Sequence, residues 1–219
     1  MALGRRLPLA LLALVLALAA CGGSGSKKQA AQQTTTDAAG CRSVTPPPAK
    51  ARTESKPTKR LDPAKTYDVV IKTNCGDFTI RLAVSTSPAT TASFASLVQK
   101  GFFNGTVFHR IVPGFVIQGG DPTGTGTGGP GYSTVDTPPA STRYTVGVVA
   151  MAKTGAEPPG TAGSQFFVDT ADAQLPPDYA VLGRIVKGQA TVGKIAPLGD
   201  SQGVPTETVE IEKATLTVH

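Results

Sequence analysis

The stretch Phe108–Gly120 reads FHRIVPGFVIQGG and decides the fold of this 219-residue chain. Its short apolar runs, Val107–Ile111 and Phe115–Gln118, are separated by a Pro-Gly pair, a pattern typical of short β-strands joined by turns. The same stretch holds one guanidinium, two phenyl rings and one carboxamide. A second stretch, Gly163–Val168 (GSQFFV), again combines an amide with aromatic residues. These two stretches are the candidate walls of a functional site.

The segments around them predict more short strands and two helices. Tyr67–Thr73 and Asp77–Leu82 are rich in β-forming residues and predict a hairpin. Ser87-Pro88 predicts the start of a helix, because Ser is a favoured N-cap and Pro fits the first helical position. Gly101 predicts the end of this helix. Further strand candidates are Val146–Ala152, Gln165–Asp169, Ala180–Val186 and Val209–Val218, and Gly188–Leu198 is a weaker helix candidate. Eight short strands with two helices indicate a mainly β fold, a closed eight-stranded antiparallel β-barrel capped by two α-helices.

The first twenty residues have the pattern of an export signal. Two arginines precede an apolar run, Leu7–Ala20, which is shorter than the roughly 20 residues that a membrane-spanning helix needs. Cys21 follows small residues, as in a bacterial lipobox, so we expect 1–20 to be a signal peptide and Cys21 to carry lipid. The alternative is an ordinary signal peptide with an incidental cysteine. Two or more acyl chains on Cys21 would hold the protein stably on the outer face of a membrane.

Residues 21–60 are expected to be a disordered basic tether, followed by one domain at 61–219. The segment is rich in Gly, Ser, Thr, Gln, Pro and Lys and has almost no large apolar residues. Residues 1–60 carry a net charge of +8, and residues 61–219 carry −2. A nucleic-acid-binding domain should carry its positive charge on its own surface, so we expect no nucleic-acid partner. The basic tether would suit an anionic bilayer, or it is simply a solvated linker.

The two remaining cysteines, Cys41 and Cys75, form an even pair in a chain expected to be exported to an oxidising compartment. A disulfide between them would attach the tether to the first hairpin. The alternative is two unpaired thiols.

The motifs resemble those of the cyclophilins, a family of peptidyl-prolyl cis-trans isomerases, over about residues 66–218. Landmarks in family order are Ser87-Pro88-x-Thr90, GFFNG at 101–105, FHRIVPGFVIQGGD, the GTGTGG loop, Val149-Ala150-Met151-Ala152, GSQFF and VLGRIV at 181–186. The resemblance implies an eight-stranded barrel with two helices and binding of proline-containing unfolded or extended polypeptides.

Rotation about an X–Pro bond requires loss of amide resonance, but no proton, electron or covalent bond is transferred. A catalyst therefore needs an apolar pocket for the proline ring, anchors for the backbone, and a donor that stabilises the twisted amide. Arg110 fits the donor role, Phe115 and Phe167 fit the pocket, and Gln118 can hold a substrate carbonyl. The resemblance implies catalytic roles for Arg110, Phe115 and Gln118 and places these further residues in the substrate groove: Val116, Gly126, Ala152, Lys153, Gln165, Phe167, Leu175 and Tyr179. Strand alternation would separate Phe115 from Gln118, so a local bend is required if both line the pocket.

Several positions depart from the family pattern. The family often has Met at Val116, Asn at Lys153 and His at Tyr179, and Gln174 takes the place of a frequent Trp, so we expect weak binding of cyclosporin. His109 is expected to be a packed structural residue, since the reaction needs no base.

We expect no cofactor, no metal site and a monomer. Two alternative functions remain: an adaptor that binds proline peptides with little catalysis, and a structural or adhesive surface lipoprotein.

Overall fold

The computed structural model describes Thr36 and residues 39–219. The expected signal peptide, Cys21 and the first part of the expected tether lie outside these residues. Within the described part of the chain, no helix is long and apolar enough to cross a membrane.

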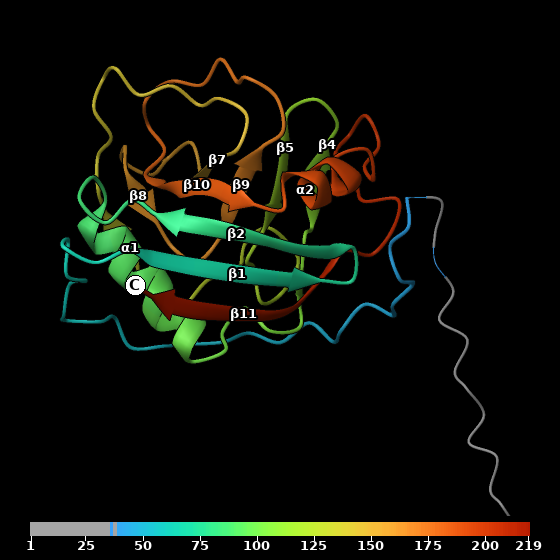
Figure 1. Cartoon of the computed structure of the whole chain (residues 1–219), viewed down its shortest axis with the longest axis horizontal. Coiled ribbons are helices and arrows are strands. Elements are labelled where there is room, and N and C mark those ends of the chain that lie inside the picture. Colours follow the sequence, from blue (N-terminus) through green and yellow to red (C-terminus); the bar gives the residue numbers. More distant parts are fainter. Residues whose placement is uncertain (1–35, 37–38) are drawn as a thin grey trace, which may run out of the picture. The chain divides into compact units, whose positions relative to one another are not determined.

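Nine antiparallel strands form one curled sheet in the order β3-β11-β1-β2-β10-β7-β9-β5-β4 (Figure 1). Their bounds are β1 Tyr67–Thr73, β2 Gly76–Leu82, β3 Thr106–Val107, β4 Arg110–Val112, β5 Val116–Gly119, β7 Val148–Met151, β9 Phe166–Asp169, β10 Val181–Lys187 and β11 Glu210–Val218. A small second sheet pairs β6 (Thr134–Val135) with β8 (Thr161–Ala162). The helices are α1 (Pro88–Gln99) and α2 (Gln189–Ile195).

The predicted mainly β fold with two helices is confirmed, but two details differ. The run 107–111 is not one strand: β3 pairs with β11 and β4 pairs with β5, so the main sheet has nine strands rather than eight. The edge strand β3 meets the other side of the sheet at an isolated bridge between Val107 and Asp121, which follows β5, and not along a full ladder. The predicted closed barrel is therefore a curled sheet with a short seam.

Aliphatic residues make up most of the core, and phenylalanine supplies many of its largest fully buried side chains, since the chain has no tryptophan. Phe94, Phe103, Phe108 and Phe166 are all buried and contact one another, mostly edge to face. Phe166 is central to this group, since its ring lies within 6.1 Å of the other three centroids. This packing fixes β9, whose opposite face carries the candidate site.

Helix α1 begins where the sequence predicts, but with a different cap. The Ser87 side chain makes no capping hydrogen bond. Instead Asp136 accepts a hydrogen bond from the Thr90 amide at 2.6 Å. A carboxylate at a helix N-terminus satisfies an otherwise unpaired N–H and suits the helix dipole. The cap is thus supplied by a residue distant in sequence.

The segment 41–60 is not the disordered tether that its composition predicts. It is an extended segment without helix or strand that runs along the domain beside β11, drawn from blue to cyan in Figure 1. A disulfide joins Cys41 to Cys75 in the β1–β2 turn. The adjacent Arg42 amide donates to the Asn74 carbonyl at 2.8 Å, and the Arg42 side chain forms an ion pair with Glu212 of β11. We call residues 41–60 the arm.

Polar contacts continue along the arm. The Arg52 guanidinium donates to the Phe102 and Asn104 carbonyls. Farther on, the Glu54 amide donates to the Pro130 carbonyl at 2.9 Å, and Lys56 Nζ donates to the Ser133 carbonyl at 2.8 Å. Composition could not reveal this order, because it comes from a covalent bridge and from carbonyl groups of the domain. Residues 39–219 carry a net charge of +3, so the arm adds positive charge to the domain.

Candidate active site

Strand register places three candidate side chains in one row across the sheet. Arg110 lies opposite Gln118 in the β4–β5 pair, and Gln118 lies opposite Phe167 in the β5–β9 pair. Directly opposed residues of antiparallel strands project to the same face. A cation, an amide and a phenyl ring that are far apart in sequence are therefore neighbours on one face of the sheet.

Phe115 joins this row because it precedes β5 and belongs to the β4–β5 turn. Gly114 has a φ of 71°, and the Phe115 amide donates to the Val112 carbonyl at 3.0 Å. Because Phe115 lies in this turn, its side chain does not follow the strand alternation that would place it on the other face of the sheet from Gln118. The Arg110 Cζ atom lies 5.9 Å from the centroid of the Phe115 ring, a distance suited to a cation–π contact. The required local bend is this turn.

A cavity of about 310 Å³ lies above this row, and we call it the Arg110 pocket. Nine of the eleven predicted groove residues line it: Arg110, Phe115, Val116, Gln118, Ala152, Lys153, Phe167, Leu175 and Tyr179. Val116 and Phe167 form a buried base, while Phe115, Leu175 and Tyr179 are partly buried apolar walls. The result is a small apolar hollow with one guanidinium and one carboxamide at its edge.

Tyr144 positions one wall of the pocket, although the sequence interpretation did not include it. Its hydroxyl donates to the Tyr179 carbonyl at 2.7 Å and accepts from the Tyr179 amide at 3.0 Å. The rings of Tyr144, Phe167 and Tyr179 also contact one another at 5.6 to 6.5 Å between centroids. Burial raises the pKa of the Tyr144 hydroxyl to about 12, so it remains a donor. No local sequence signal links residues 35 positions apart.

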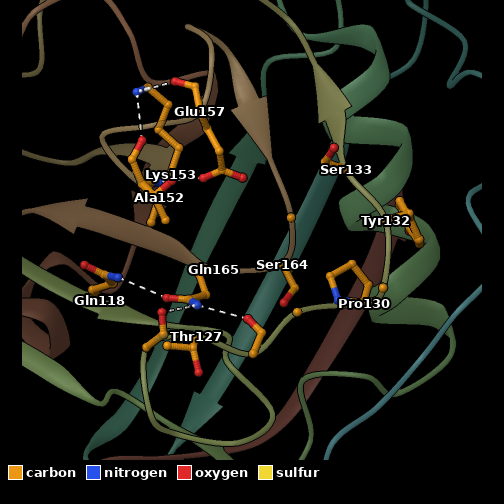
Figure 2. A pocket seen from close by; sticks show the side chains of 16 residues that line it. Gln118, Thr127, Pro130, Tyr132, Ser133, Ala152, Lys153, Glu157, Ser164 and Gln165 are labelled. Atoms are coloured by element: carbon orange, nitrogen blue, oxygen red, sulfur yellow. Dashed lines mark hydrogen bonds between the residues drawn. The ribbon is translucent and has the colours of Figure 1, made fainter.

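A second cavity of about 650 Å³ adjoins the first, and we call it the loop pocket (Figure 2). It shares Gln118, Ala152 and Lys153 with the Arg110 pocket, and its remaining lining comes from residues 126–133, 154, 157 and 163–165. The other two predicted groove residues, Gly126 and Gln165, lie here. Gln165 is the link between the pockets: its Oε1 accepts from Gln118 Nε2 at 3.1 Å, and its Nε2 donates to the Gly126 and Gly128 carbonyls at 2.9 and 3.0 Å.

Asp121 organises the glycine-rich wall of the loop pocket. This fully buried carboxylate accepts five hydrogen bonds, from Thr123 Oγ1 and from the amides of Thr123, Thr125, Gly126 and Gly128. Burial alone would raise its pKa, but these donors outweigh burial and lower it. A Cβ on Gly128 would lie 2.0 Å from the carboxylate, so glycine is required there. The sequence patterns did not identify Asp121, because the hydrogen bonds that it accepts form only in the folded loop.

Two other titratable groups lie close to the site without lining it. Burial lowers the pKa of His109, and neither ring nitrogen has a hydrogen-bond partner among the described residues, although Gln165 lies nearby. This environment suits the predicted structural role. Asp169, at the end of β9, lies opposite Val116 and is also buried without a partner for either oxygen in the described chain. Throughout residues 39–219, no group of three or more His, Cys, Asp or Glu side chains is arranged to hold a metal ion.

Comparisons with known proteins agree with this geometry. Residues 68–216 match the family model described as cyclophilin type peptidyl-prolyl cis-trans isomerase/CLD. A peptidyl-prolyl cis-trans isomerase-like 1 from Neurospora crassa is 39% identical over 153 residues, which cover 67% of this chain and 92% of that protein. A probable peptidyl-prolyl cis-trans isomerase B from Mycobacterium leprae is 41% identical over 196 residues, covering 78% of this chain and 65% of that protein.

Solved structures show the same relationship. A cyclophilin type peptidyl-prolyl cis-trans isomerase from Cryptosporidium parvum superposes with a TM-score of 0.64 at 33% identity, covering 69% of this chain and 98% of that one. A second crystal structure of that protein, determined in the presence of the dipeptide Ala-Pro, has the same TM-score. The family-model match at residues 68–216 contains both pockets and begins after the arm. With its fold, its motifs and its curated relatives in agreement, the chain belongs to the cyclophilin-type peptidyl-prolyl cis-trans isomerases.

Proposed function

We propose that this isomerase accelerates X–Pro rotation in exported polypeptides while it is anchored to the extracytoplasmic face of a membrane by lipid on Cys21. The single observation that carries the catalytic part is the position of Arg110 at the edge of the apolar Arg110 pocket, beside Gln118 and over the Phe115 ring. The membrane part is supported by the signal-like leader and by the position of Cys21.

In this proposal the proline ring enters the Arg110 pocket and rests on Phe115 and Phe167. When the X–Pro bond twists, the proline nitrogen becomes pyramidal and basic, and the Arg110 guanidinium donates a hydrogen bond to it. Gln118 holds a backbone carbonyl of the substrate, and Gln165 orients Gln118. The donor stabilises the twisted amide more than the planar one, which lowers the rotation barrier.

The assay is two-dimensional NMR exchange on an Ala-Pro peptide with the full-length chain. The wild type should accelerate cis-trans exchange, and Arg110→Ala should lose most of that acceleration with an unchanged fold. Equal rates in the two proteins would reject the assigned donor. Binding of the peptide without acceleration by the wild type would instead favour the proline-binding adaptor.

The membrane proposal has a separate test. Mass spectrometry of the mature N-terminus should show a chain that begins at Cys21 and carries acyl groups. Cleavage elsewhere, or an unmodified Cys21, would contradict it and leave the isomerase proposal intact.

A further inference from the structure

We infer that Lys153 makes this isomerase prefer substrates with an acidic side chain close to the proline. The inference rests on the proposed function and adds a substrate class to it. Lys153 lines both the Arg110 pocket and the loop pocket, so an extended peptide whose proline occupies the first pocket passes this side chain on its way into the second.

The Lys153 ammonium is held in place by neutral groups. Nζ donates to the Glu157 carbonyl at 3.1 Å (Figure 2) and to the Thr154 carbonyl at 3.2 Å. It also lies 5.6 Å from the centroid of the Tyr179 ring. These contacts restrict the long side chain, which reduces the entropy lost when it pairs with a ligand. The cation is therefore positioned before any substrate arrives.

No carboxylate of the described chain forms an ion pair with Lys153 or with Arg110. The lining of the Arg110 pocket contains both cations and no acidic side chain. Glu157 is the one carboxylate in the lining of the loop pocket, and its Oε2 already accepts from the Thr154 amide at 2.6 Å. Asp178 precedes Tyr179 in sequence but lines neither pocket.

The lining of the two pockets thus holds two cations and one carboxylate, an excess of positive charge, although residues 61–219 carry a net charge of −2. One of these cations, Arg110, is assigned to the reacting amide, which leaves Lys153 to meet a neighbouring side chain. An opposite charge at this half-exposed position should favour binding, and a like charge should weaken it. This selectivity is distinct from the isomerisation step, which uses Arg110.

The test compares peptides that carry Glu, Gln or Lys at each of the two positions on either side of the X–Pro unit. Rates are measured by NMR exchange with the full-length chain, because no coupled protease then adds its own preference. For at least one of these positions, kcat/KM should fall in the order Glu, Gln, Lys, with about a two- to fivefold advantage of Glu over Gln, the size expected for a half-exposed ion pair. The advantage should shrink in 0.5 M salt because of screening.

Lys153→Gln should abolish the Glu-over-Gln advantage, and Lys153→Glu should reverse it. Lys194→Gln is the matched control: it removes one positive charge from an exposed residue of α2 that lines neither pocket. Its Glu-over-Gln ratio should equal that of the wild type. An active wild type without charge preference at any position, or a preference that survives Lys153→Gln, would overturn this inference alone. Absence of catalysis with every peptide would instead overturn the proposed function.

Discussion

Replacing Asp169 with Asn should stabilise the protein above neutral pH. Asp169 is fully buried at the end of β9, two residues after Phe167 and opposite Val116, and therefore lies beneath the Arg110 pocket. Neither of its carboxylate oxygens has a hydrogen-bond partner within the described chain. Burial, with a smaller repulsion from Asp172, raises its pKa from 3.8 to about 7. The fold therefore favours the neutral acid.

The magnitude follows from the difference between these two pKa values. In the unfolded chain Asp169 loses its proton near pH 3.8, whereas in the folded chain it keeps the proton until about pH 7. Between these values the folded state binds more protons, so the free energy of unfolding falls by about 1.4 kcal/mol per pH unit. Over the whole window the loss is about 4 kcal/mol, and it is complete above pH 7. Asn mimics the neutral acid and does not titrate.

The assay is urea unfolding of the wild type and Asp169→Asn between pH 4 and pH 8.5. The difference in unfolding free energy should grow in favour of Asn from about pH 4 to pH 7 and then stay constant. Asp77→Asn, on an exposed residue of β2, controls for the removal of one negative charge from the protein. It should show no such pH-dependent gain. A constant difference between wild type and Asp169→Asn across the range would mean that Asp169 is ionised and solvated in the folded state, and would refute the reasoning.

Three further predictions concern the site and the arm. Arg110→Ala should lower kcat/KM by about 10²- to 10³-fold, the usual effect of losing a transition-state donor, in NMR exchange with an unchanged circular dichroism spectrum; a smaller effect than tenfold would contradict the donor role. Joint replacement of Cys41 and Cys75 by Ser, which opens a loop with a sequence separation of 34, should lower the free energy of unfolding by about 4 kcal/mol in denaturant titrations, and reduced wild type should match the variant. Tyr144→Phe removes both hydrogen bonds to the Tyr179 backbone, so it should cost about 1 to 3 kcal/mol of stability and raise KM more than it lowers kcat. Unchanged stability and KM would show that ring packing alone holds Tyr179.

Local sequence patterns identified most elements of the fold. Residue propensity and turn signals, which act over a few neighbouring residues, predicted the β1–β2 hairpin and the start of α1. They also predicted most of the later strands. The break between β3 and β4 was missed, because their partners, β11 and β5, are far apart in sequence. The capping of α1 by Asp136 was missed for the same reason.

The candidate site, too, was predicted only in part from the sequence. The motifs at 108–120 and 163–168 contained Arg110, Gln118 and Phe167, but their spacing left open whether Phe115 could face the same cavity. The β4–β5 turn resolved that question. The support that Asp121 gives the loop pocket depends on hydrogen bonds to amides that come together only in the folded loop.

By itself, the sequence determined the family, most of the strand and helix segments and the candidate site residues, because these depend on side-chain identity and on patterns between near neighbours. Only the tertiary structure decided that the arm at 41–60 is ordered, that the groove is two adjoining pockets, and that Asp169 lies buried beneath one of them. The physical reason is that order, burial and hydrogen bonding arise from contacts between distant segments. Composition and periodicity contain no record of those contacts.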